Sequence, residues 1–275
     1  MAPKTALITG CSSGFGLLAA VELARAGFRV FASMRNLAKS SALEAALAQA
    51  GVSAELLQLD VTDTASMELA VAAAGPVDAL VNNAGYGLLG FAEDVSVDEL
   101  REQFETNFFG LVTLTKAFIP SMRQRRSGRI IQVSSLNGCV GIPTLSAYCS
   151  SKFAVEGWSE ALRHELLPYG VYVVLVEPGT FKTEVFASRR RAAALDDGTS
   201  PHSELTEKLE AWGVDRANKS RADPRTVAKV IARAASERRP PLRYPVGIDA
   251  RLGTAAKSVL PHRAFELATG FLLKD

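Results

Sequence analysis

Short apolar runs, each separated from the next by a helix-length segment, recur along the whole 275-residue chain. Most lack polar alternation, which is the pattern of strands buried on both faces. The predicted strands are residues 5–9, 28–34, 54–59, 77–81, 129–133, 171–176 and 242–246. Because helical patterns alternate with these runs, we expect parallel strands joined by right-handed crossovers. The sequence therefore predicts one α/β domain over residues 1–275: a doubly wound parallel sheet of about seven strands with helices on both faces.

A glycine-rich segment, Gly10 to Gly16, follows the first predicted strand at once, and a helical pattern from 17 to 26 comes next. Glycines let the backbone approach a pyrophosphate, and a helix N-terminus offers N–H donors and a positive dipole end. A plain tight turn is the alternative interpretation. It is the weaker one because the strand and the helix are both in place.

The residues that end the second predicted strand, Ser33 to Asn36, include no acid. Many NAD-binding folds have an Asp or Glu there to hold the ribose hydroxyls. Arg35 can instead meet a 2′-phosphate with charge-assisted hydrogen bonds, although an ordinary solvent-facing arginine is the alternative. Asp60 ends the third strand, on the side where ligands bind in open α/β sheets. A cap on the following turn explains Asp60 equally well.

Tyr148 and Lys152 are four residues apart in a segment predicted to be helical from about 146 to 167. That spacing puts both side chains on one face of the helix. A nearby ammonium stabilises a phenolate and lowers the pKa of the phenol, so the pair could exchange a proton with a carbonyl or alcohol oxygen. Taken alone, the spacing favours a chance meeting of two surface side chains, and the rest of the chain has to change that balance.

Other segments carry weaker indications of function. Asn82 and Asn83 end the fourth strand, where their amides could join the loop to a neighbouring strand or touch a ligand. A long helical pattern covers 97–123 with Asn107 inside it, although asparagine is an indifferent helix former. Residues of about 180–223 lose clear strand order, as lids and binding loops do. The segment of about 249–273 reads as helical, interrupted by Pro261.

Composition excludes several classes of protein. The net charge of +2 gives no electrostatic case for nucleic-acid binding. The three cysteines have no metal-like spacing, so we expect neither a disulfide framework nor a metal site. Neither a signal peptide nor a membrane-spanning run is visible. A cytoplasmic protein fits these observations best.

Together these residues resemble the short-chain dehydrogenase/reductase family, in its compact single-domain branch. The family's glycine motif matches Thr9, Gly10, Gly14 and Gly16, and its Asn-Asn-Ala-Gly motif matches 82–85. Its catalytic Asn, Ser, Tyr and Lys match Asn107, Ser135, Tyr148 and Lys152. Residues 9–16 and 243–247 are similar to the hydroxysteroid and retinol dehydrogenase-like members, a narrower and less specific likeness.

The resemblance implies a Rossmann-type fold and hydride transfer between a nicotinamide and a carbonyl or alcohol carbon. Tyr148 would be the general acid or base, Lys152 would lower its pKa and hold the nicotinamide ribose, Ser135 would bind the substrate oxygen, and Asn107 would position a water. NADP(H) is the expected cofactor because Arg35 replaces the acid. The residues expected to bind it are Gly10, Ser12, Ser13, Gly14, Phe15, Gly16, Arg35, Asp60, Val61, Asn83, Tyr148, Lys152, Pro178, Gly179, Phe181 and Thr183.

The expected partner is a lipophilic small molecule with a ketone, aldehyde or alcohol group. The family also implies a homodimer or homotetramer, built on apolar residues such as Phe108, Phe109, Leu111 and Trp158. The main alternative is a dinucleotide sensor that keeps the fold without turnover. Such proteins usually lose the Tyr or the Lys, and this chain has both.

Overall fold

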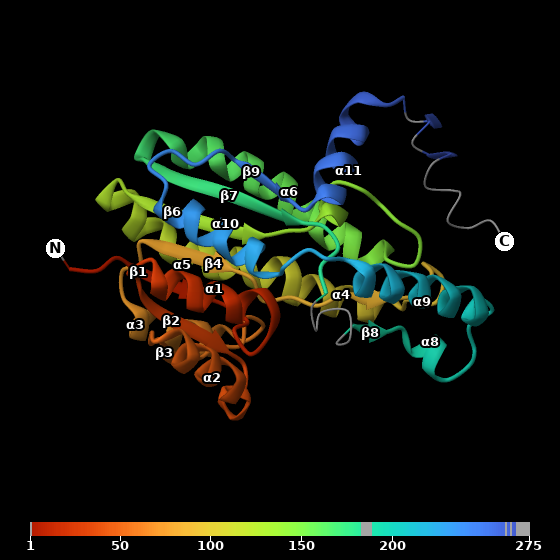
Figure 1. Ribbon diagram of the computed structural model, residues 1–275, viewed down its shortest axis with the longest axis horizontal. Coiled ribbons are helices and arrows are strands. Elements are labelled where there is room, and N and C mark those ends of the chain that lie inside the picture. The colour runs from red at the N-terminus through yellow and green to blue at the C-terminus, as the bar shows by residue number, and fades with distance from the viewer. Residues whose placement is uncertain (1, 183–188, 262, 265, 268–275) are drawn as a thin grey trace.

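A seven-stranded parallel sheet forms the centre of the molecule (Figure 1). The computed structural model describes residues 2–182, 189–261, 263–264 and 266–267. Its strands are β1 (Thr5–Ile8), β2 (Arg29–Met34), β3 (Glu55–Gln58), β4 (Ala79–Asn82), β6 (Gly128–Val133), β7 (Val171–Pro178) and β9 (Arg243–Val246). Their spatial order is β3-β2-β1-β4-β6-β7-β9. The predicted doubly wound Rossmann-type sheet is confirmed, and the strand order reverses between β1 and β4, where such sheets bind ligands.

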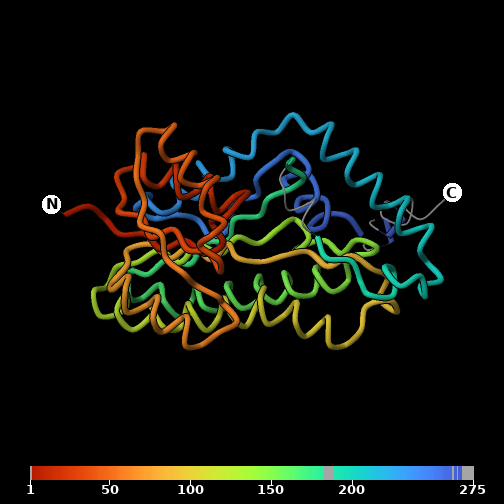
Figure 2. Tube along the Cα trace, turned by 90° about the horizontal axis from the view of Figure 1, so that it is seen from below, coloured from red at the N-terminus to blue at the C-terminus, as the bar shows by residue number. Residues whose placement is uncertain are grey.

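Helices cover both faces of this sheet (Figure 2). One layer consists of α1 (Gly14–Arg25), α2 (Ser41–Ala50) and α10 (Arg225–Ser236). The opposite layer contains α3 (Thr64–Ala74), α5 (Gly110–Arg125) and α6 (Ser146–Leu166). Successive residues of a strand pack against opposite helix layers: Ile130 belongs to one buried cluster and Ile131 to the other. This explains why the strands lack polar alternation.

The long helix predicted over 97–123 is interrupted. It begins as α4 (Val97–Phe104), widens into a π-helical segment (Glu105–Phe109) and continues as α5. Gly110 lies directly after this segment, and a Cβ there would come within 2.3 Å of the Val61 carbonyl oxygen. The interruption places Asn107 inside the protein, fully buried.

The segment after β7 is more ordered than the sequence indicated. Arg190–Arg191 forms β8, which pairs with β5 (Leu88–Leu89), and α8 (Ala193–Asp196) and α9 (Ser203–Lys219) follow. The lack of strand order over about 180–223 is thus no lack of structure, because α9 is a helix of 17 residues. This helix buries only Thr206 and Ala217, so it lacks the broad apolar stripe by which core helices are recognised.

The C-terminal helix α11 spans Ile248–Val259, and the predicted interruption at Pro261 follows its end. Both α9 and α11 lie at the end of the molecule away from the N-terminus (Figure 1). No helix among the described residues is long and apolar enough to span a membrane. All three cysteines are free thiols.

Candidate active site

The glycine-rich loop joins β1 to α1 through two glycines with positive φ, Gly10 at 73° and Gly14 at 58°. Gly16 packs so closely that a Cβ would lie 2.3 Å from the Gly10 carbonyl oxygen and 2.4 Å from Asn83 Nδ2. The Ser13 side chain makes no capping bond, and the first turn of α1 contains no acid. The N–H groups of this turn therefore remain suited to an anion. Ser12 and Phe15 complete the loop.

Asn83 fastens the loop to the end of β4. Its Nδ2 donates to the carbonyl oxygens of Thr9 at 2.9 Å and Gly10 at 3.1 Å. Thr9 Oγ1 in turn accepts from the backbone N–H groups of Asn83 and Ala84. One of the two roles considered for the Asn pair is therefore seen directly: Asn83 joins neighbouring strand ends. Asn82 has a different role, since its amide donates to Thr115 and Gln132 inside the protein.

Arg35 lies just beyond the end of β2 and is exposed. Ser33 is not available to a ligand at this strand end, because it is buried and its hydroxyl donates to the Ile8 carbonyl oxygen at 2.9 Å. Asp60 follows β3, and its Oδ1 accepts from the backbone N–H and hydroxyl of Thr62. Asp60 thus has one of the two roles considered for it, as a cap on its own turn, while Asp63 caps α3. Val61, next to Asp60, is buried against Gly110.

Tyr148 stands in the first turn of α6, at the wall of a cavity of about 280 Å³. Burial raises the pKa of its phenol, and the hydrogen bond from the Ser135 hydroxyl opposes this rise. Ser135 Oγ also accepts from the Asn137 N–H at 3.1 Å, which fixes the loop that carries it. The predicted catalytic Ser and Tyr thus meet in the structure.

Lys152 lies one turn further along α6 and is 5% exposed. Its Nζ donates to the Val133 carbonyl oxygen at 2.8 Å and lies 5.9 Å from the Tyr148 ring centroid. Burial lowers the pKa of Lys152 to about 8, against the opposing effect of Glu156. The structure differs here from the expected lowering of the Tyr148 pKa by Lys152: burial dominates, and the ammonium is directed to a backbone carbonyl.

Protein groups hold the Asn107 side chain in place. Its Oδ1 accepts from the Tyr86 N–H at 3.0 Å, and its Nδ2 donates to Tyr86 O and Ser151 Oγ. The side chain thereby ties the π-helical segment to the loop after β4 and to α6. A Cβ on Gly85 would lie 2.9 Å from Asn107 Oδ1 and 3.8 Å from Lys152 Nζ, so these two groups flank Gly85.

The end of β7 closes the cavity next to the glycine loop. Pro178 and Gly179 line it, and Phe181 packs edge-on against Phe15 with ring centroids 5.7 Å apart. Thr183 lies outside the described residues. Sequence reasoning missed Asp249, whose Oδ2 accepts from the Thr180 N–H at 2.7 Å and whose Oδ1 would lie 2.0 Å from a Cβ on Gly179.

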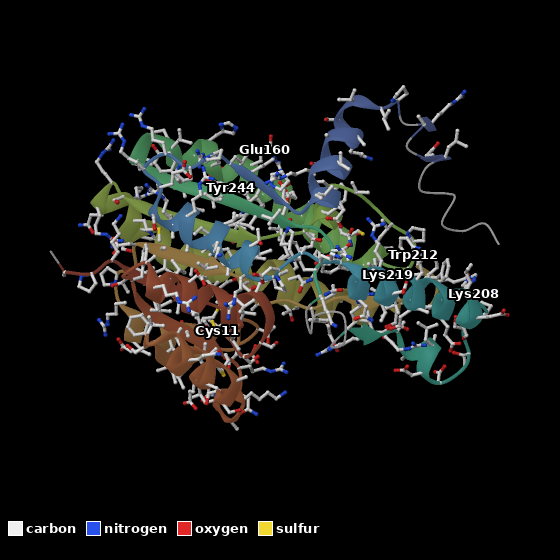
Figure 3. The ribbon with its side chains drawn as sticks, viewed as in Figure 1. Cys11, Glu160, Lys208, Trp212, Lys219 and Tyr244 are labelled. Atoms are coloured by element: carbon white, nitrogen blue, oxygen red, sulfur yellow. The ribbon has the colours of Figure 1, made fainter. Side chains whose placement is uncertain are left out.

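Apolar groups dominate the rest of the cavity wall. They come from the β5 region, the loop before α6 and one face of α9, and include Leu89, Ile142, Leu145, Leu209 and Trp212. Leu209, Trp212, Gly213 and Arg216 follow helical spacing, which could have revealed this face of α9 in the sequence. Trp212 is labelled on α9 in Figure 3.

Known proteins resemble this chain over most of its length. A family model described as short chain dehydrogenase matches residues 4–194. The chain is 42% identical to the uncharacterized oxidoreductase YusZ of Bacillus subtilis, covering 97% of each protein. It is 41% identical to retinol dehydrogenase 8 of Bos taurus, over 88% of this chain and 81% of that protein. Identity is 39% to human 17-beta-hydroxysteroid dehydrogenase type 1, over 89% and 77% respectively.

Solved structures of short-chain dehydrogenases and of a ketoreductase also resemble this chain. A short-chain dehydrogenase from Streptomyces avermitilis superposes with a TM-score of 0.81 at 33% identity, covering 98% of both chains. An actinorhodin polyketide ketoreductase with NADPH gives a TM-score of 0.72 at 31% identity, over 85% of this chain and 90% of that one. A protein from Burkholderia phymatum in complex with NAD gives 0.79 at 25% identity, over 97% and 95%.

Proposed function

Because the chain belongs to the short-chain dehydrogenase/reductase family of oxidoreductases, we propose that it is an NADP(H)-dependent enzyme that interconverts a carbonyl compound and an alcohol. Reduction of a ketone or aldehyde is the proposed working direction, and the substrate is a lipophilic small molecule. The observation that carries this proposal is the hydrogen-bonded Tyr148–Ser135 pair at the wall of an apolar cavity, with Lys152 one turn behind.

The residues at the strand-order reversal fit a nicotinamide dinucleotide. The space beside Gly16 leaves no room for a side chain, and the first turn of α1 offers uncapped N–H groups to a pyrophosphate. The other proposed contacts of the dinucleotide are Ser12, Ser13 and Phe15 of the same loop, Asp60 and Val61 after β3, and Asn83 after β4. When bound, the dinucleotide supplies or accepts the hydride.

The chain's own residues would hold the reacting oxygen and move the proton. The Tyr148 hydroxyl would give its proton to the carbonyl oxygen during reduction and take one from the alcohol during oxidation. Ser135 would donate a hydrogen bond to the same oxygen, which stabilises negative charge as it develops. Lys152 would hold a sugar hydroxyl of the cofactor. Asn107 would keep α5 and α6 in register and position a water beside Lys152.

The proposed preference for NADP(H) rests on Arg35. No acid follows β2 to repel a 2′-phosphate, and an exposed guanidinium can grip one with two parallel hydrogen bonds. Among the related structures, the actinorhodin ketoreductase is named with NADPH and the Burkholderia protein with NAD. Membership of the family therefore does not decide between NADP(H) and NAD(H), and the proposal depends on the residues at the end of β2.

The proposed substrate class follows from the apolar cavity wall and from the names of relatives. Retinol dehydrogenase and 17-beta-hydroxysteroid dehydrogenase are named for lipophilic alcohols. We further propose that residues 1–275 form one catalytic domain, with a lid at about 180–223 and the C-terminal helical segment of about 249–273. Pro178, Gly179, Phe181 and Thr183 would contact the cofactor under that lid. A cytoplasmic location is proposed from the three free thiols.

A panel of ketones and aldehydes tests this function. Purified protein is mixed with NADPH and each compound, and the loss of absorbance at the reduced nicotinamide band is followed. Hydrophobic ketones should be reduced and small hydrophilic ones should react more slowly. Binding of NADPH without oxidation by any compound of the panel would favour the sensor alternative.

A further inference from the structure

Four ionisable residues follow one face of α6 at intervals of four: Tyr148, Lys152, Glu156 and Glu160. This stripe begins at the substrate cavity and ends at the outer surface, where the Glu160 side chain is 55% exposed (Figure 3). The proposed reaction uses the first two residues and gives no role to the third. Glu156 is nevertheless 5% exposed, and a carboxylate is rarely buried without a partner.

Glu156 belongs to a buried group of charges behind Lys152. Arg243 on β9 bonds to Glu156, to Glu177 at 2.9 Å and to Glu160 at 2.8 Å. Glu177 on β7 is 1% exposed. Two buried carboxylates therefore share one guanidinium, which leaves one negative charge uncompensated when both are ionised, unless a second cation lies close.

Lys152 is that second cation. It precedes Glu156 by one turn on the same helix face, where side chains four apart are neighbours. Its ammonium bonds to the Val133 carbonyl, and the Ser134 hydroxyl, from the next residue, lies beside the Glu156 carboxylate. The two buried carboxylates and the two cations would balance when Lys152 is protonated, whereas water screens the charge of the exposed Glu160.

Cys139 lies next to this group. Its Sγ, one oxygen of Glu156 and one oxygen of Glu177 all lie within 4.8 Å of one another. Such a set could hold a metal ion, but Arg243 already binds both carboxylates. Burial and the charge of Glu156 raise the pKa of Glu177 to about 7, and burial also raises that of Glu156. Burial, and then the charges of Glu156 and Glu177, raise the pKa of Cys139, so its thiol stays neutral and adds no charge to the group.

We propose that Glu156 is a positioning residue for the reaction: it is the counter-ion of Lys152, held in place by Arg243 and Glu177, and it keeps Lys152 in the ammonium form that the chemistry requires. The inference rests on the proposed function, because that function gives Lys152 its role. Glu156 never touches substrate. It acts through Lys152, from one turn further along the same face of α6, away from the cavity.

The test compares Glu156→Gln with a matched control, Glu160→Gln, in the full-length protein. Both variants remove one carboxylate that contacts Arg243, but only Glu156 is buried next to Lys152. The pKa of Lys152 is read by NMR of protein with ¹³Cε-labelled lysine, and Lys152→Arg identifies the resonance. Removal of the Glu156 charge should lower the pKa of Lys152 below its value of about 8 by about one unit. Glu160→Gln should leave the pKa of Lys152 unchanged. Glu156→Asp keeps a carboxylate and should lower this pKa by less than Glu156→Gln does.

The pH profile of kcat supplies the second readout. Loss of the Lys152 ammonium limits activity on the alkaline side, so this limb should move to lower pH by about the same one unit in Glu156→Gln. A Lys152 titration in Glu156→Gln that matches wild type, or an equal shift in Glu160→Gln, would overturn the inference. The NMR titration needs no substrate. If the protein reduces no carbonyl compound, the proposed function is contradicted, but the effect of Glu156 on the pKa of Lys152 can still be measured.

Discussion

A phenol is a weak acid in water, and burial makes Tyr148 weaker still. The hydrogen bond from Ser135 works against this effect, whereas Lys152 Nζ is directed to the Val133 carbonyl. The spacing of Tyr148 and Lys152 could be predicted from the helix period. The target of the ammonium could not, because it depends on which carbonyl of another strand lies within reach of a buried donor that must be satisfied.

Replacement of Tyr148 by Phe should remove most turnover and leave cofactor binding nearly intact. The ring still packs against the cavity wall, but the transferable proton is gone, so kcat should fall by roughly 10²–10⁴-fold. Steady-state kinetics and NADPH fluorescence titration measure the two effects. Tyr169→Phe is the control, since Tyr169 lies beyond the end of α6 and outside the cavity lining. Near-normal kcat in Tyr148→Phe would mean that another group supplies the proton.

Arg35→Ala should raise KM for NADPH by roughly tenfold or more and hardly change KM for NADH. One charge-assisted hydrogen bond to the 2′-phosphate accounts for about a decade in affinity. Added salt should weaken the NADPH preference of the wild type because Arg35 is exposed. Lys39→Ala removes another exposed positive charge a few residues away and should change neither constant. Equal or better kcat/KM with NADH in the wild type would contradict the assignment of Arg35.

At the scale of elements, the strands were predictable because each is a short apolar run that two helix layers bury. The π-helical turn at Glu105–Phe109 was not predictable, since its local residues also suit an α-helix and the deviation arises from tertiary contacts of Asn107 and Gly110. The pairing of β5 with β8 joins two-residue strands distant in sequence. Such short strands carry no periodicity that a sequence could display.

Gly16→Ala tests the contact between the glycine loop and β4. A methyl group there would collide with the Gly10 carbonyl and with Asn83 Nδ2, so the loop must shift. We expect a lower melting temperature and at least a tenfold loss of NADPH affinity, measured by calorimetry and fluorescence titration; the affinity term corresponds to about 1.4 kcal/mol.

The matched control is Gly157→Ala on α6, where a Cβ would meet nothing within 4 Å. Alanine in an exposed helix interior should stabilise the protein by about 0.5–1 kcal/mol relative to glycine. NADPH affinity in this variant should not change. If Gly16→Ala binds NADPH as tightly as Gly157→Ala, the close packing of the loop is not what shapes the cofactor site.

At the scale of the whole molecule, we propose a homodimer or homotetramer built on the outer faces of α4 to α6. Of the apolar residues considered for this role, Leu111 is 4% exposed and belongs to the chain's own core. Phe109 is 49% exposed, and Phe153 on α6 is 43% exposed, so these side chains remain for contact with a second copy. The sequence could indicate apolar positions on these helices but not which of them the chain itself covers.

Sedimentation velocity should show a dimer or tetramer at micromolar concentration, and Phe109→Asp should shift it towards monomer. A charged side chain at the centre of an apolar interface has no partner to replace its lost water. Ile248→Asp changes an exposed apolar residue of α11 and should leave the assembly unchanged. A wild type that sediments only as monomer would exclude this interface.

Asp249 at the start of α11 has a consequence for the order in which the protein matures. Its carboxylate accepts a hydrogen bond from the Thr180 N–H and lies against Gly179, so one wall of the cavity is made by a residue that follows the glycine loop by more than 200 positions. Synthesis delivers the chain from its N-terminus, and the glycine loop, β1 and β4 leave the ribosome long before Asp249. The elements proposed to hold the dinucleotide are therefore made first, and the substrate cavity is completed only after Asp249 has been translated.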